Sequence, residues 1–217
     1  MEIITNILDF VLHIDKHLVE LVKDYKTWTY LIIFIIIFAE TGFVITPFLP
    51  GDSLLFAVGA LIAKGNTGLD IYLMCLFLCI AAITGNTVNY YLGNYFGPKV
   101  FKEGNKILSR DYYLKTQAFF AKHGGKAVIF SRFLPIFRTV APFVAGVGGM
   151  AMGRYTFYNI IGGVSWIVSF LGIGFVFGNI PVIKDNFTIV VIVIMVLTVL
   201  PVIYAGVKSK FSKKSDS

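Results

Sequence analysis

Apolar residues occur along this chain in long runs, separated by short basic stretches and by stretches rich in glycine and proline. Residues 71–98 and 155–180 contain no charged residue, and each run is long enough to cross a membrane as a helix. Residues 187–207, rich in Val and Ile, form a third such run. The pattern therefore predicts about three transmembrane helices.

Two other apolar stretches, residues 27–63 and 127–153, are interrupted within the run. The residues expected to break them are Pro47, Pro50, Gly51, Pro135 and Pro142. The apolar run before the first break, residues 28–39, is shorter than the roughly 20 residues that a full crossing needs. Because proline stops a helix from continuing, we expect each stretch to form a re-entrant hairpin of two half-helices. A single kinked span is the alternative for the first stretch.

The remaining segments are amphipathic or polar. Residues 1–26 repeat apolar side chains at helical spacing, which predicts an amphipathic helix in the membrane interface or packed on the protein itself. Residues 99–123 are basic and weakly amphipathic, and residues 208–217 form a short basic tail. We therefore expect one integral membrane domain over residues 1–217.

The two broken stretches resemble each other. Phe48-Leu49-Pro50 corresponds to Phe133-Leu134-Pro135, and Phe56-Ala57-Val58-Gly59 corresponds to Phe143-Val144-Ala145-Gly146. Each repeat, residues 27–95 and 99–180, contains one hairpin and one full span. With one crossing per repeat, the second copy enters from the opposite face, which is typical of inverted-repeat transporters. The predicted fold is an all-α membrane protein: two inverted re-entrant hairpins, about three transmembrane helices and amphipathic helices.

Composition and charge placement agree with this interpretation. Of the 217 residues, 57% are hydrophobic and only 14% are charged, against about a quarter charged in soluble domains. Basic residues gather in residues 99–126 and in the tail, whereas residues 1–26 hold three Lys against five acids. Basic loops favour the cytoplasmic side, so the C-terminus is expected in the cytoplasm. Anionic lipid head groups explain the net charge of +7, and nucleic acid is not an expected partner.

Four charged residues stand inside the broken stretches: Glu40 and Asp52 in the first, Arg132 and Arg138 in the second. An ionised side chain at membrane depth costs about 2.5–3.5 kcal/mol on insertion scales, so these residues need a compensating role. They form either an ion-pair cluster that holds the hairpins together or a binding site. Arginine forks match phosphate, which makes Arg132 and Arg138 candidate phosphate ligands.

The two acids have different expected roles. Burial favours the neutral form of Glu40 and a nearby arginine favours the charged form, so Glu40 is a candidate proton carrier. In Pro50-Gly51-Asp52-Ser53, Asp52 is either a helix N-cap or a second proton-coupling group. No metal or cofactor site is evident. Trp166 and the polar face around Asn86 and Asn89 are expected to serve helix packing.

These residues also carry a family resemblance. The first half contains Glu40-Thr-Gly and then Pro47-Phe-Leu-Pro50-Gly51-Asp52-Ser53. The second half contains Gly124, Arg132-Phe-Leu-Pro135-Ile-Phe-Arg138, Pro142, Ala145-Gly146, Met150, Phe157 and Asn159. Over residues 27–180 the chain resembles the DedA family, whose signature reads E-x-G, then P-x-(L)-P-G-(D/E). The resemblance places the family's essential acids on Glu40 and Asp52, and its essential arginines on Arg132 and Arg138.

The resemblance implies a lipid transporter of the bacterial cytoplasmic membrane rather than an enzyme. Undecaprenyl phosphate is the expected substrate and the proton motive force the expected driving force. A phosphatidylethanolamine flippase or scramblase, or a proton-coupled exchanger of small ions or drugs, is the alternative. A lipid phosphatase is disfavoured because no histidine lies in an apolar segment. A homo-oligomeric assembly is left open.

Overall fold

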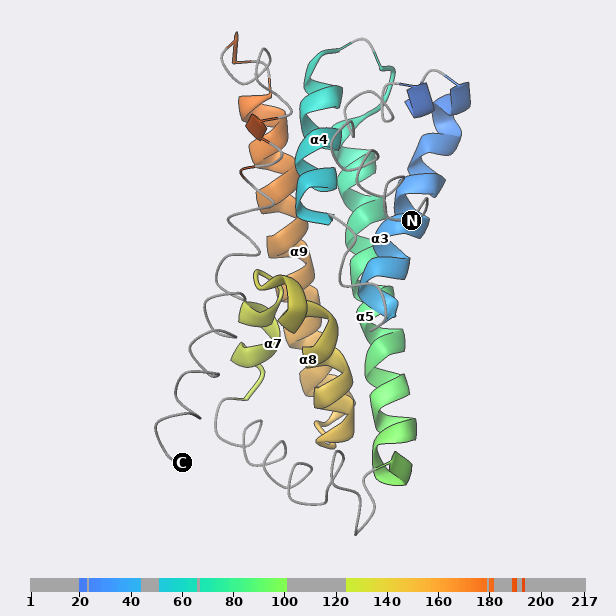
Figure 1. Cartoon of the computed structure of the whole chain (residues 1–217), viewed down its shortest axis with the longest axis vertical. Coiled ribbons are helices and arrows are strands. Elements are labelled where there is room, and N and C mark those ends of the chain that lie inside the picture. Colours follow the sequence, from blue (N-terminus) through green and yellow to red (C-terminus); the bar gives the residue numbers. More distant parts are fainter. Residues whose placement is uncertain are drawn as a thin grey trace, which may run out of the picture. The chain divides into compact units, whose positions relative to one another are not determined.

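The computed structural model describes residues 20–22, 24–43, 51–65, 67–100, 124–178, 180–181, 189–190 and 193 (Figure 1). Within these residues every regular element is a helix, which confirms the all-α class. Several predicted segments lie wholly or almost wholly outside the described part: the amphipathic segments near residues 1–26 and 99–123, the third span, the basic tail, Pro47 and Pro50.

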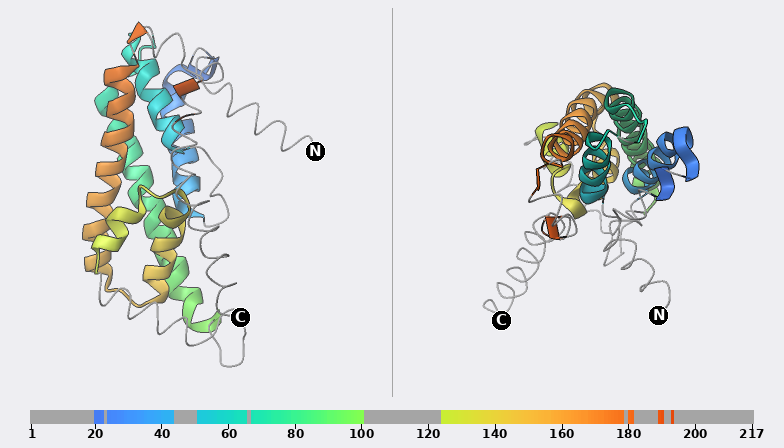
Figure 2. Two further views of the ribbon diagram at one scale, coloured as in Figure 1. Left: turned by 60° about the vertical axis from the view of Figure 1, so that its left-hand side comes forward. Right: turned by 90° about the horizontal axis from the view of Figure 1, so that it is seen from above.

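The described residues form seven elements in chain order. They are η1 (Lys26–Trp28), α3 (Thr29–Gly42), α4 (Gly51–Ala63), α5 (Ile71–Val100), α7 (Lys126–Ser131), α8 (Pro135–Val147) and α9 (Met152–Phe177). Figure 2 gives two further views of the same helices. The long helices α5 and α9 correspond to the two uncharged runs, and the four shorter α-helices fall in the two broken stretches.

Helices α5 and α9 have the properties of membrane spans. They contain 30 and 26 residues, and both are long and apolar enough to cross a membrane. Only 39% and 33% of their most apolar windows are buried. Large side chains such as Tyr72, Leu76, Phe157 and Val176 lie exposed along them. A helix in the core of a soluble protein would bury these side chains, so the exposed apolar faces suit a lipid environment.

The first broken stretch forms two separate helices. α3 ends at Gly42 and α4 begins at Gly51, so the predicted breaker Gly51 is the first residue of a helix, while Pro47 and Pro50 lie outside the described residues. Both helices consist mostly of apolar residues. Every residue of α4 except the last is buried. The helices are 14 and 13 residues long, too short for each to cross a bilayer alone.

The second broken stretch is interrupted at Pro135 but not at Pro142. α7 ends at Ser131, and Pro135 begins α8 at a position where its missing N–H breaks no helical bond. The expectation that Pro142 breaks the chain is wrong, because Pro142 lies inside α8. A proline there removes one bond in the helix, while later residues keep theirs: Gly148 N–H donates to the Val144 carbonyl at 2.8 Å.

The chain divides into two compact units. Unit 1 comprises residues 1–31, 50–75 and 167–217, and unit 2 comprises residues 32–49 and 76–166. Unit 1 therefore contains α4 and the C-terminal part of α9, whereas unit 2 contains α7, α8, most of α5 and the N-terminal part of α9.

In unit 1, α4 packs on α9 through glycines. A Cβ added at Gly59 would meet the backbone of Leu171, and one added at Gly174 would meet the backbone of Phe56. One turn further along, Gly178 faces Ala60. Because the contact advances by four residues on both helices, the two helices run in the same direction.

In unit 2, α8 packs on α5 in the same way. A Cβ at Gly146 would meet the backbone of Tyr90, and one at Gly93 would meet the backbone of Phe143. Gly59 and Gly146 occupy equivalent places in the repeat, as do Phe56 and Phe143. The weak sequence repeat is thus matched by the same helix contact, made once in each unit.

Candidate functional site

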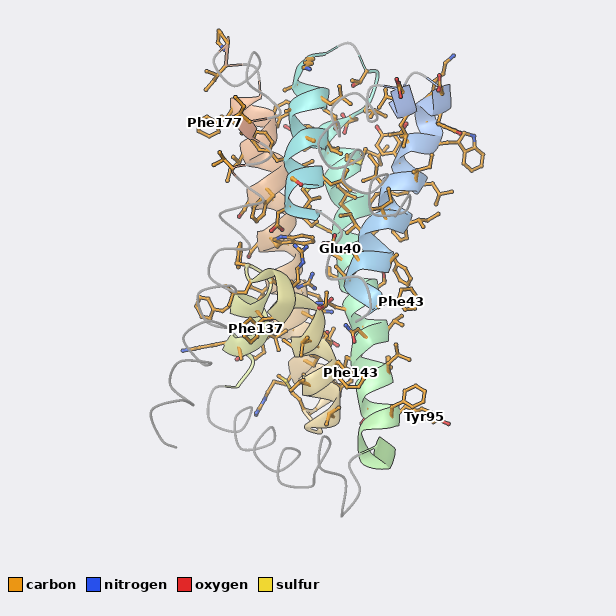
Figure 3. All side chains as sticks on the ribbon, in the orientation of Figure 1. Glu40, Phe43, Tyr95, Phe137, Phe143 and Phe177 are labelled. Carbon is orange, nitrogen blue, oxygen red and sulfur yellow. The ribbon has the colours of Figure 1, made fainter. Side chains whose placement is uncertain are left out.

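Unit 2 holds a group of polar side chains that are all buried. The members are Glu40, Thr41, Asn86, Asn89, Arg132, Arg138, Thr139 and Asn159, called the polar cluster below. Figure 3 draws these side chains as sticks, with Glu40 of α3 and Phe137 and Phe143 of α8 labelled for orientation. Buried polar groups must find partners within the protein, so the contacts of each member define the site.

Glu40 and Arg138 form a buried ion pair. Glu40 lies in the last turn of α3 and Arg138 in the first turn of α8, and their side chains are 0% and 4% exposed. A guanidinium nitrogen of Arg138 donates directly to a carboxylate oxygen of Glu40. The predicted acid and arginine of different broken stretches are therefore brought together by the fold.

Arg138 has a second neighbour that the sequence did not reveal. Its guanidinium carbon lies 5.2 Å from the ring centroid of Trp166, within the range of a cation–π interaction. Trp166 is fully buried, so its predicted packing role is only part of its contribution. The ring helps to hold the positive charge of Arg138 opposite Glu40.

Arg132 is more deeply buried than Arg138, yet the groups that hold it in the described chain are neutral. It is 1% exposed and follows the end of α7. Its NH2 donates to the Ala82 carbonyl at 3.2 Å and to the Asn159 side-chain oxygen. With the Asn86 amide oriented to satisfy both its ends, the Asn86 oxygen accepts from NH2 at 2.8 Å and from Nε at 3.2 Å.

The charge of Arg132 thus lacks a carboxylate partner within the part of the chain that the structure describes. Its other terminal nitrogen, NH1, is buried and has no hydrogen-bond partner there. Two glycines of α9 leave room for the side chain: a Cβ added at Gly163 would lie 3.3 Å from NH2, and one at Gly162 would lie 3.3 Å from Cγ. The described residues therefore enclose the guanidinium of Arg132 closely but place no carboxylate in contact with it.

Two asparagines of α5 connect the end of α3 with the arginine-bearing segment. The Thr41 carbonyl accepts from the side-chain nitrogen of Asn89 at 3.3 Å and from that of Asn86 at 3.1 Å. Asn89 also donates to the Thr139 carbonyl, next to Arg138, at 2.7 Å. The Thr41 carbonyl lies in the last turn of α3, where helix carbonyls lack partners within the helix. These bonds are possible because α3 approaches Gly85 closely: a Cβ there would lie 2.8 Å from the Phe38 carbonyl.

Asp52 belongs to unit 1, whereas the polar cluster belongs to unit 2. It is the second residue of α4 and is 6% exposed, so it lies inside the first turn rather than at the N-cap. A carboxylate in the first turn is stabilised by the helix dipole. The structure thus gathers three of the four predicted site residues into one cluster and places the fourth at the start of a helix in the other unit.

Asn86, Asn159 and Trp166 were not predicted as site residues. Asn86 was visible as part of a polar face on an uncharged span, and Asn159 as part of the second motif, but nothing in the sequence linked either one to Arg132. Across the described ranges, no three His, Cys, Asp or Glu side chains gather as a metal site would require.

Comparison with known proteins shows the family of the chain. The VTT domain model matches residues 49–176. Protein DedA of Escherichia coli K12 is 47% identical over 211 residues, covering 97% of this chain and 96% of that protein. The chain belongs to the DedA family. The domain match includes Asp52, Arg132 and Arg138, while the Escherichia coli alignment spans nearly the whole chain.

Two other relatives of this chain have names that describe them as membrane proteins. Inner membrane protein YqjA of Escherichia coli K12 is 36% identical over 154 residues, covering 70% of this chain and 69% of that protein. An uncharacterized membrane protein of Mycobacterium leprae is 36% identical over 173 residues, covering 79% and 77%. No solved structure matches. The relatives' names and the exposed apolar helices agree that this is a membrane protein.

Proposed function

We propose that this DedA family protein is a translocase that moves a phosphate-headed lipid across the bacterial cytoplasmic membrane, driven by the proton motive force. Undecaprenyl phosphate is the substrate that the family resemblance implies. The observation that carries the proposal is the state of Arg132, a buried cation whose hydrogen-bond partners in the described chain are all neutral. In this topology the broken stretches are re-entrant hairpins and the C-terminus is cytoplasmic.

A purely structural role for the charges would leave each arginine neutralised by an acid. Arg138 fits that description because Glu40 pairs with it. Arg132 does not, since its partners in the described chain are two amides and a backbone carbonyl. Burying an uncompensated charge costs several kcal/mol. A phosphate that enters from outside would supply the missing anion, and Arg is well suited to bind it.

The surface around the arginines suits a substrate with a charged head and an apolar tail. Phe130, Phe133, Leu134 and Phe137 flank the two arginines in sequence and are exposed, Phe130 by 68% and Phe137 by 52%. The guanidinium groups from the same segment are buried. A lipid could place its phosphate inside while its chains stay among the exposed aromatic side chains.

Glu40 provides the proton coupling in this scheme. When Glu40 is ionised, it occupies Arg138. When Glu40 takes up a proton, the ion pair is lost, and Arg138 can turn its donors to a phosphate beside Arg132. Trp166 retains Arg138 in place during the exchange. Asp52 is a second candidate for the coupled proton.

The test is lipid flipping in proteoliposomes with a fluorescent undecaprenyl phosphate analogue and an imposed pH gradient. Arg132→Gln and Glu40→Gln should each lower the rate at least tenfold. Arg154→Gln is the matched control, because Arg154 is an exposed arginine at the start of α9, away from the polar cluster. Normal flipping by both Arg132→Gln and Glu40→Gln would overturn the assignment.

The same vesicles separate the alternative functions. A labelled phosphatidylethanolamine that moves faster than the phosphate-headed lipid would indicate a phospholipid flippase or scramblase. Proton-driven uptake of a water-soluble ion or drug, independent of lipid, would indicate an exchanger. Release of inorganic phosphate from the lipid would indicate an enzyme.

A further inference from the structure

Two asparagines hold Arg132, although a carboxylate at either place would satisfy the same donors. The Asn86 oxygen accepts from two nitrogens of Arg132, and the Asn159 oxygen accepts from NH2. Asn86 is 1% exposed and Asn159 is 0% exposed. A buried arginine that served only to stabilise the fold would gain from a negative partner, because an opposite charge offsets the cost of burying it.

We infer that Asn86 and Asn159 are specificity-determining residues, which hold Arg132 in position while leaving its positive charge available to a phosphate group. The inference rests on the proposed function and assigns the role of the amides within it. A neutral amide fixes the guanidinium by hydrogen bonds without cancelling its charge. The ligand class is a phosphate monoester, whose oxygens carry negative charge and accept from guanidinium donors.

The contacts of Asn86 show how the position is fixed. Its side-chain nitrogen donates to the Thr41 carbonyl at 3.1 Å, and its backbone carbonyl accepts from the Tyr155 hydroxyl at 2.8 Å. Asn86 is therefore anchored to α3 and to α9 while its oxygen faces Arg132. Asn86 thus links Arg132 with Thr41, the residue that follows Glu40.

Asn159 is anchored independently. Its side-chain nitrogen donates to the Ile83 carbonyl at 3.0 Å and to the Thr87 hydroxyl at 3.2 Å. Both partners lie on α5, whereas Asn159 lies on α9. The two amides thus approach Arg132 from different helices, and both present an oxygen.

NH1 of Arg132 points to where the ligand binds. It is the one terminal nitrogen of this guanidinium that no group in the described chain accepts from, although it is buried. Leaving a buried charged donor without an acceptor is costly. A phosphate oxygen at NH1 would complete the hydrogen bonds of Arg132 and neutralise its charge.

The experiment replaces each amide by the carboxylate of the same shape. Asn86→Asp and Asn159→Asp keep an oxygen toward Arg132 but add a negative charge beside it. Asn94→Asp is the matched control, because Asn94 is exposed on α5 outside the polar cluster. Binding to the full-length protein in detergent is measured by native mass spectrometry, and melting temperature is measured in parallel. The probes are phosphatidic acid, diacylglycerol and inorganic phosphate.

The wild-type protein and Asn94→Asp should bind phosphatidic acid in preference to diacylglycerol. Asn86→Asp and Asn159→Asp should each bind phosphatidic acid at least tenfold more weakly. Their melting temperatures should stay close to that of the wild type, because the new ion pair with Arg132 offsets the lost donation to the Thr41 or Ile83 carbonyl. Using two amides with different anchors guards against one variant failing to fold. A structural role alone would not combine retained stability with lost binding.

Two contrary results have different meanings. If the wild type prefers phosphatidic acid and both Asp variants bind it equally well, the role of the amides is overturned and the proposed function stands. If the wild type does not distinguish phosphatidic acid from diacylglycerol, the proposed function itself fails. Binding of inorganic phosphate that depends on Asn86 and Asn159, without binding of phosphatidic acid, would support the amides but contradict a lipid substrate.

Discussion

Units 1 and 2 share a helix contact but differ in what they bury beside it. In unit 1, α4 meets α9 at Gly59 and Gly174, and the buried residues of α4 beyond Ser53 are apolar apart from the glycine. In unit 2, α8 meets α5 at Gly146 and Gly93, beside a cluster of buried amides, arginines and Glu40. The repeat thus supplies a common helix pair, and within the described residues unit 2 adds Arg132, a buried cation with no carboxylate partner among them.

The largest expected effect comes from breaking the shared contact. Gly59→Leu or Gly146→Leu forces a side chain into the backbone of the facing helix, and overpacking of this kind costs about 1–3 kcal/mol or more. We expect loss of folded protein for both, measured as the monodisperse fraction in size-exclusion chromatography. Gly172→Leu is the control, because a Cβ at Gly172 meets no atom within 4 Å. Equal yields from all three variants would contradict the shared contact.

The next effect separates the two arginines. Arg138→Ala leaves Glu40 buried without this partner and should cost about 3–5 kcal/mol of unfolding free energy. Arg132→Ala removes a charge that has no carboxylate partner among the described residues. It should cost less, about 1–3 kcal/mol for the acceptors left behind. Denaturant titration in detergent micelles measures both. The reverse order would show that Arg132, not Arg138, is the neutralised residue.

A smaller effect is expected at the ring that faces Arg138. Trp166→Leu removes the cation–π contact, worth about 2 kcal/mol where water is excluded, together with some packing. Trp166→Phe keeps a ring and should lose less. If the contact matters for Arg138, the penalty of Trp166→Leu should shrink in an Arg138→Met background, measured as a double-mutant cycle. A penalty that does not change would assign Trp166 to packing alone.

The smallest effect tests the support of Asn86. Tyr155→Phe removes the hydroxyl that donates to the Asn86 carbonyl at 2.8 Å and should cost about 1 kcal/mol of unfolding free energy. Its stacked neighbour Tyr90 lies 4.3 Å away between ring centroids and donates instead to the Met150 carbonyl. Both Phe variants should cost similar stability, but only Tyr155→Phe should weaken phosphatidic acid binding. If the two variants bind phosphatidic acid equally well, the support of Asn86 by Tyr155 plays no part in phosphate binding.

Much of the helical framework could be predicted because hydrophobic runs and helix breakers act locally. The uncharged runs became α5 and α9, and the break at Pro135 separates α7 from α8. Pro142 was misjudged because one missing N–H does not end a helix whose other bonds remain. Asp52 was placed near a helix start, but its position within the first turn depends on where α4 begins.

By itself, the sequence determined that four charges stand in apolar, broken stretches, since charge and hydropathy belong to each residue alone. It also determined the family motif and the glycines that recur in the repeat. Only the tertiary structure decided which charges are neutralised. Glu40 and Arg138 are far apart along the chain and meet because α3 and α8 pack in one unit. Arg132, close to Arg138 in sequence, faces amides from α5 and α9 instead, because partners in a folded protein are chosen by helix packing rather than by position along the chain.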